Sequence, residues 1–140
     1  GLPKDLRTEE ARINWQILNR VSSIKIIVSN MLTPAVKVAL SNAHIIIDAI
    51  FGTGIKGVIR EPYASAIELI NRCGAYKVAV DIPSGLDPNT GRVSHVCIKA
   101  NDTITFHRLK KGLLNNKKHT GKIFIENIGI PKVAEKGIIR

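Results

Sequence analysis

Two aspartates, Asp48 and Asp81, lie where short apolar runs typical of buried strands come to an end. A glycine-rich loop follows Asp48, and Asp81 is followed by a turn in which Pro83 and Gly85 cannot continue a strand. The two acids are about one βαβ unit apart. Neighbouring parallel strands would therefore bring both carboxylates to the sheet edge where open α/β proteins bind ligands. The alternative is that Asp81 only caps its turn through backbone amides.

The chemistry open to these carboxylates depends on what offsets their charge. Two carboxylates side by side repel each other unless a cation or a shared proton lies between them. A hard cation held by oxygen ligands is one solution, and the Ser84 hydroxyl in the same turn could supply a further oxygen. The pattern therefore indicates a cation site or acid/base chemistry at this edge.

The loop after Asp48 matches the G-x-G-x-x-G fingerprint of dinucleotide-binding domains at residues 52–57. That fingerprint opens a helix directly, whereas residues 58–61 separate this match from Pro62. An NAD-dependent dehydrogenase is therefore the less favoured interpretation. Exposed amides bracketed by Lys56 and Arg60 suit a phosphate or a polar nucleotide better. A surface loop that binds nothing is the alternative.

Alternating helices and strands must position these residues. Helices are predicted to begin after the capping residues Thr8 and Thr33 and at Pro62, the last of them ending near Gly74. Apolar runs predict strands at residues 24–28, 44–48, 77–80, 103–106 and 122–126. This alternation is typical of an α/β fold with a mainly parallel sheet covered by helices. Because the chain opens with a turn and a helix, we expect it to start within such a fold.

Composition narrows the partners and the compartment. With 140 residues the chain suits one domain, and 21 basic against 11 acidic residues favour a phosphorylated small molecule or nucleic acid. No aromatic residue that could stack on bases interleaves the basic run at 107–122, which argues against a dedicated single-strand nucleic-acid binder. No apolar run approaches the ~20 residues of a membrane span. A cytoplasmic protein with Cys73 and Cys97 as reduced, structural thiols is expected.

Four segments, in this order and spacing, resemble the YjeF N-terminal domain family, which includes the NAD(P)H-hydrate epimerases. They are residues 48–71, 78–91, 101–114 and 121–131, and the motif Asp-Ile-Pro-Ser-Gly-Leu-Asp at 81–87 is the most specific. The resemblance extends over residues 6–131 and implies a three-layer α/β/α, Rossmann-like fold. It also implies repair of nicotinamide cofactors by interconversion of the R and S forms of hydrated NADH or NADPH.

The resemblance also implies roles for individual residues. The family's potassium ligands, for one ion per subunit, fall on Asp48 and Ser84, and its substrate-binding acid falls on Asp81. Its substrate loop falls on Gly52, Thr53, Gly54, Ile55, Lys56, Gly57 and Val58. Because the reaction moves protons without redox change, Asp81 is the expected acid/base and Lys56 its expected partner. Lys110 is expected to reach a substrate phosphate.

The chain departs from the family at its beginning. Family members start with a further βαβ unit whose Asn-Asn-Gly-Gly-Asp-Gly-like loop cradles the substrate phosphates, and nothing here matches it. Residues 1–140 are therefore expected to be a partial domain lacking the first βαβ unit and inactive alone. A homodimer and a fused or separate dehydratase are the expected partners. The alternatives are a non-catalytic, dimerising scaffold that binds RNA or protein and, less favoured, the dehydrogenase.

Overall fold

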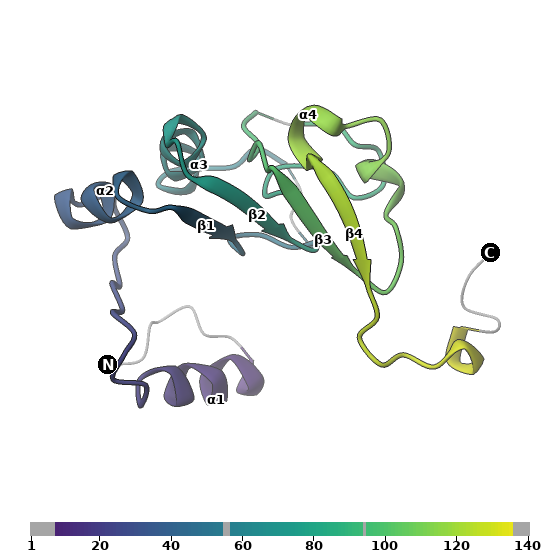
Figure 1. Cartoon of the computed structure of the whole chain (residues 1–140), viewed down its shortest axis with the longest axis horizontal. Coiled ribbons are helices and arrows are strands. Elements are labelled where there is room, and N and C mark those ends of the chain that lie inside the picture. Colours follow the sequence, from purple (N-terminus) through teal and green to yellow (C-terminus); the bar gives the residue numbers. More distant parts are fainter. Residues whose placement is uncertain (1–7, 55–56, 94, 136–140) are drawn as a thin grey trace.

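A four-stranded, entirely parallel sheet forms the centre of the computed structural model, which describes residues 8–54, 57–93 and 95–135. The strands are β1 (Ile45–Asp48), β2 (Tyr76–Val80), β3 (Asp102–Phe106) and β4 (Lys122–Glu126), and they lie side by side in chain order. Asp48 pairs with Ala79, and Val80 pairs with Ile104. All four carboxyl ends consequently meet at one edge of the sheet (Figure 1). The α/β fold, its parallel sheet and four of the five predicted strands are confirmed.

The helices begin where local capping signals predict them. Helix α1 (Glu9–Leu18) begins after Thr8, whose hydroxyl accepts a hydrogen bond from the Ala11 amide. Helix α2 (Pro34–Ser41) begins after Thr33 in the same way. The remaining elements are α3 (Tyr63–Arg72), the 3₁₀ helix η1 (Lys111–Leu113), α4 (Lys117–Thr120) and the 3₁₀ helix η2 (Lys132–Glu135). No helix in the described residues is long and apolar enough to cross a membrane.

The prediction of a strand at residues 24–28 is wrong. This segment connects α1 to α2 without pairing to any strand of the described chain. The side chains of Ile24, Ile27 and Val28 are largely exposed. A β-branched run favours extended backbone, but a strand also needs a neighbour to complete its hydrogen bonds. The segment lies away from the sheet (Figure 1). Its backbone therefore has no neighbouring strand with which to form hydrogen bonds.

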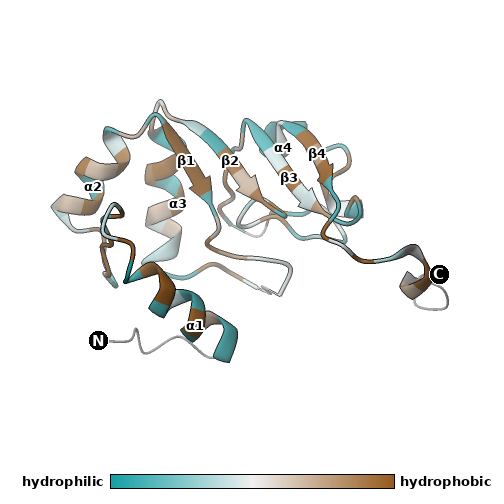
Figure 2. Ribbon diagram, turned by 60° about the horizontal axis from the view of Figure 1, so that its bottom comes forward, coloured by the Kyte–Doolittle hydropathy of each residue, from teal (hydrophilic) through white to brown (hydrophobic). Residues whose placement is uncertain are grey.

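The two faces of the sheet differ in how far their apolar side chains are buried. On one face, Ile46 and Ala79 form the main core with Ile67 of α3 and Ile98, both fully buried. The opposite face leaves apolar side chains in solvent: Ile45 is 63%, Ile47 67% and Tyr76 47% exposed. Figure 2 is turned toward this open face and shows β1 in hydrophobic brown with α3 behind it. Helix α1 lies on the open side but buries none of its own residues, so the described residues cover the sheet closely on one side only.

Candidate functional site

The turn after β2 is fixed by close backbone packing. Gly85 has φ +100°, and a Cβ there would collide with the backbone at Val96 and Cys97. The Ile98 amide donates a hydrogen bond to the Ser84 carbonyl oxygen (3.0 Å). The turn residues Pro83, Ser84 and Leu86 are fully buried. This packing holds Ser84 beneath the end of β1.

Asp48 and Ser84 form one buried pair, each 1% exposed. The Ser84 hydroxyl donates to Oδ1 of Asp48 (2.6 Å), and the Ser84 amide donates to Oδ2 (2.8 Å). Burial raises the pKa of Asp48, and the hydrogen bonds from Ser84 and the Ile50 amide offset this only in part. The structure therefore brings together the two residues that the sequence analysis assigned to a cation.

The oxygens around this pair have the chemistry that a hard cation prefers. The Phe51 carbonyl oxygen lies 3.4 Å from Ser84 Oγ, so carboxylate, hydroxyl and carbonyl oxygens are grouped together. Within the described ranges, no three His, Cys, Asp or Glu side chains are arranged to hold a metal ion. An oxygen-only site for a weakly bound cation fits these residues better than a site for a transition metal.

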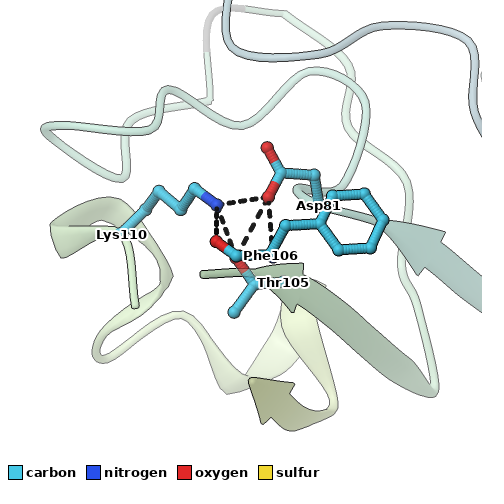
Figure 3. A network of polar contacts seen from close by, with 4 residues as sticks. All are labelled: Asp81, Thr105, Phe106 and Lys110. Carbon is cyan, nitrogen blue, oxygen red and sulfur yellow. Dashed lines mark hydrogen bonds and ion pairs between the residues drawn. The ribbon is translucent and has the colours of Figure 1, made fainter. Parts of the chain in front are cut away.

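Asp81 lies at the centre of a second polar network, between the ends of β2 and β3 (Figure 3). Its backbone adopts φ 66°, and its amide donates to the Ile104 carbonyl oxygen (2.8 Å). Its Oδ1 accepts hydrogen bonds from the Phe106 amide (3.0 Å) and the Thr105 hydroxyl (3.3 Å), and it forms an ion pair with Lys110 Nζ. Its other oxygen, Oδ2, accepts no hydrogen bond from the described residues and points away from Lys110 in Figure 3.

The ionised form of Asp81 is favoured by this network. Partial burial by itself would raise the pKa of Asp81, but the hydrogen bond from Lys110 leads a set of interactions that outweighs it. The amide of Phe106, the charge of Lys110 and the hydroxyl of Thr105 act in the same direction, and the pKa of Asp81 is lowered. At neutral pH this group is therefore a carboxylate with one restrained and one available oxygen.

The two acids lie at the same sheet edge, as predicted, but their charges are accommodated separately. Asp48 is held by Ser84 in the interior, whereas Asp81 is held by Lys110 and the end of β3. A cation or proton shared between both carboxylates is therefore not needed. Asp87, which ends the same motif, accepts hydrogen bonds from the Asn89 and Thr90 amides, so it caps its own turn.

The glycine-rich loop leaves the sheet beside Asp48 and lies on the surface. Gly52, Thr53, Gly54, Gly57 and Val58 are exposed. Added Cβ atoms at the three glycines would meet nothing within 4 Å. Ile55 and Lys56 lie outside the described residues. Helix α3 begins only at Tyr63, so the loop does not open a helix as a dehydrogenase fingerprint does.

Sequence reasoning missed Thr105 and Phe106 and gave Lys110 a different partner. Lys110 was expected to reach a phosphate, whereas in the structure its ammonium contacts Asp81. The available signal was a cation shortly after a third strand of the same parallel sheet. Its side chain could be expected at the same edge as the two acids.

Comparison of the sequence with known proteins shows which proteins this chain is similar to. The family model described as YjeF-related protein N-terminus matches residues 2–112. The NAD(P)H-hydrate epimerase of Nitrosopumilus maritimus is 46% identical over 139 residues, which are 99% of this chain and 62% of that protein. The enzyme of the same name from Cenarchaeum symbiosum is 48% identical, again over 99% of this chain and over 63% of its own length.

The chain is also similar to part of a longer protein that is named as a bifunctional enzyme. The bifunctional NAD(P)H-hydrate repair enzyme Nnr of Methanothermobacter thermautotrophicus is 44% identical over 137 residues, 96% of this chain and 26% of its own length. The chain thus spans less than two thirds of the two epimerases and about a quarter of the bifunctional enzyme.

Proposed function

Because the chain belongs to the YjeF-related protein N-terminus family, we propose that it is the part of an NAD(P)H-hydrate epimerase that carries the acid/base. The observation that carries this proposal is the way in which the two carboxylate oxygens of Asp81 are bonded. Its carboxylate is held through Oδ1 at the carboxyl edge of the sheet, while Oδ2 accepts no hydrogen bond from the described residues. The names of the similar proteins supply the substrate, hydrated NADH or NADPH.

The proposed reaction inverts the configuration at C6 of the hydrated nicotinamide ring, a carbon bonded to a hydroxyl group and a nitrogen. Inversion requires that one bond to C6 breaks and re-forms on the other face. Removal of the hydroxyl proton lets the C6–O bond become a carbonyl while the C6–N bond breaks and the nitrogen keeps the electron pair. Attack of that nitrogen on the other face of the carbonyl, with return of the proton to the oxygen, gives the epimer with no redox change and no covalent nucleophile. Asp81 is the proposed acid/base because Oδ2 can accept a proton and return it. Lys56 is the proposed partner that assists the substrate hydroxyl.

The same edge offers the remaining parts of a binding site. The loop at residues 52–58 is the proposed substrate loop, and its described glycines, Gly52, Gly54 and Gly57, are exposed beside Asp48. The Asp48 and Ser84 oxygens are the proposed ligands of one potassium ion per subunit. This assignment is supported by their all-oxygen chemistry and by the burial of the carboxylate. When bound, the ion supplies a positive charge that offsets the Asp48 carboxylate.

The proposed setting is a cytoplasmic homodimer that works with a dehydratase acting on the S form. Relatives named as bifunctional repair enzymes support a fused partner, since this chain matches about a quarter of their length. The alternative is a dehydratase on a separate chain, which would act on the S form in the same way.

The test follows consumption of the R form of hydrated NADH by the full gene product. A dehydratase specific for the S form is added, so the NADH absorbance band returns only as fast as R is converted to S. Addition of the protein is expected to accelerate that return over the spontaneous rate. Asp81→Asn should lower kcat by about 10²-fold, because it keeps the shape of the side chain but removes the titrating carboxyl.

Asp87→Asn is the matched control for that variant. It makes the same chemical change six positions along the same motif, at a group that only caps its turn. It is expected to retain nearly full activity. Near-normal turnover by Asp81→Asn, or an equal loss in both variants, would refute the role given to Asp81.

A further inference from the structure

Lys110 is restrained far more than a surface lysine usually is. It lies between β3 and η1, and its side chain is 21% exposed. Its ammonium donates to Asp81 Oδ1, to the Thr105 hydroxyl (3.0 Å) and to the Phe106 carbonyl oxygen (2.8 Å). An ammonium has three donor hydrogens. All three are therefore used within the protein, and none is left for a substrate phosphate.

The other contacts of Asp81 converge on the same oxygen. The Phe106 amide and the Thr105 hydroxyl both donate to Oδ1, as Lys110 does. Thr105 links the two charged groups, because its hydroxyl accepts from Lys110 and donates to Asp81. The end of β3 and Lys110 thus form a clamp on one side of the carboxylate (Figure 3), and only Oδ2 is directed elsewhere.

We propose that Lys110 is a positioning residue that holds Asp81 through Oδ1 and so directs Oδ2 at the hydroxyl group on the reacting carbon of the substrate. The catalytic consequence of this inference rests on the proposed function. The contacts that form the clamp do not depend on it. Lys110 acts through Asp81 and does not contact the substrate. Its removal should therefore impair turnover more than binding, because misplacement of a catalytic group lowers the rate at a given occupancy.

The electrostatic balance at Asp81 supports the same role. Lys110 lowers the pKa of Asp81 both through its hydrogen bond and through its charge. Partial burial raises this pKa, and Lys110 contributes the largest of the opposing effects. Without Lys110, the carboxylate would keep the amide of Phe106 and the hydroxyl of Thr105 but would lose its counter-charge.

The experiment compares Lys110→Met, Lys110→Arg and Lys111→Met in the full gene product. Lys110→Met removes the charge and all three donors and is expected to lower kcat at least about tenfold with KM nearly unchanged. Lys110→Arg keeps a cation near Oδ1 and should recover part of that loss. Lys111→Met removes the adjacent, exposed lysine and is expected to have no effect on either constant.

A second readout needs no substrate. The carboxyl carbon of Asp81 is titrated by ¹³C NMR in the parent protein and in each variant, and its pKa is expected to rise in Lys110→Met and stay low in Lys111→Met. Should Lys110→Met fail to fold, Lys110→Arg and Thr105→Val, which removes the bridging hydroxyl, carry the test. Each of these two is then expected to raise the pKa of Asp81 and lower kcat by less than tenfold.

The two readouts separate failure of this inference from failure of the proposed function. An unchanged pKa of Asp81 in Lys110→Met overturns the inference whatever the activity. A rise in KM alone also overturns it, because Lys110 would then bind substrate. If the pKa moves as expected but no form of the protein epimerises hydrated NADH, the proposed function fails and the clamp on Asp81 stands.

Discussion

Gly85→Ala should destabilise the protein far more than a glycine-to-alanine change at an ordinary loop position. Gly85 has φ +100°, a conformation that costs a non-glycine residue about 1–3 kcal/mol. The added Cβ would also lie 2.9 Å from Cys97 Cα and closer still to the Val96 carbonyl oxygen. Both neighbours are backbone atoms in a buried turn, so neither can move cheaply.

The magnitude follows from adding these two effects. Overpacking a buried site by one methyl group costs about 1–3 kcal/mol. With the backbone strain, the expected loss in free energy of unfolding is about 2–6 kcal/mol. A domain has only about 5–15 kcal/mol of stability, so the variant should unfold at a much lower urea concentration. Displacement of the turn would also pull Ser84 away from Asp48.

Urea unfolding followed by far-ultraviolet circular dichroism measures this loss. The single tryptophan, Trp15, lies in α1, a helix that buries no residue, so its fluorescence would report poorly on the core. Gly74→Ala is the matched control, because a Cβ at Gly74 meets nothing within 4 Å and its φ is not left-handed. The control should change stability by less than about 0.5 kcal/mol. Equal losses in the two variants would show that the turn at Gly85 is no more closely packed than an ordinary loop.

Two further predictions concern the cation and the open face of the sheet. Potassium is expected to raise the melting temperature of the parent protein more than lithium does. Ser84→Ala should abolish the difference because it removes one proposed oxygen ligand. An equal melting temperature in potassium and in lithium would contradict the proposed site. The chain is also expected to self-associate with a second copy, because Ile47 is exposed on an apolar face beside the edge of β1 that no described strand pairs with. Ile47→Glu should weaken that association in light scattering and Lys37→Glu on α2 should not, whereas a parent chain that stays monomeric at high concentration would refute the idea.

Local signals in the sequence were sufficient to predict most of the helices and strands. The caps at Thr8 and Thr33 act over a few residues, so the starts of α1 and α2 could be predicted locally, and the apolar runs that became β1 to β4 favour extended backbone in the same local way. The segment at 24–28 shows the limit of this reasoning. Its composition favours a strand as strongly as that of β1, but pairing requires a partner that only the arrangement of the whole chain can provide.

The sequence by itself predicted that Asp48 and Asp81 follow two strands of a mainly parallel sheet, because strands and helices alternate along the chain; the order of the strands came from the structure. Only the tertiary structure decided what each acid contacts. The clamp on Asp81 depends on the register of Val80 with Ile104 and on the left-handed backbone at Asp81, which turns its side chain toward β3 and Lys110. Such contacts join loops that are distant in the chain. Their partners are therefore set by how the strands align and not by any local pattern of residues.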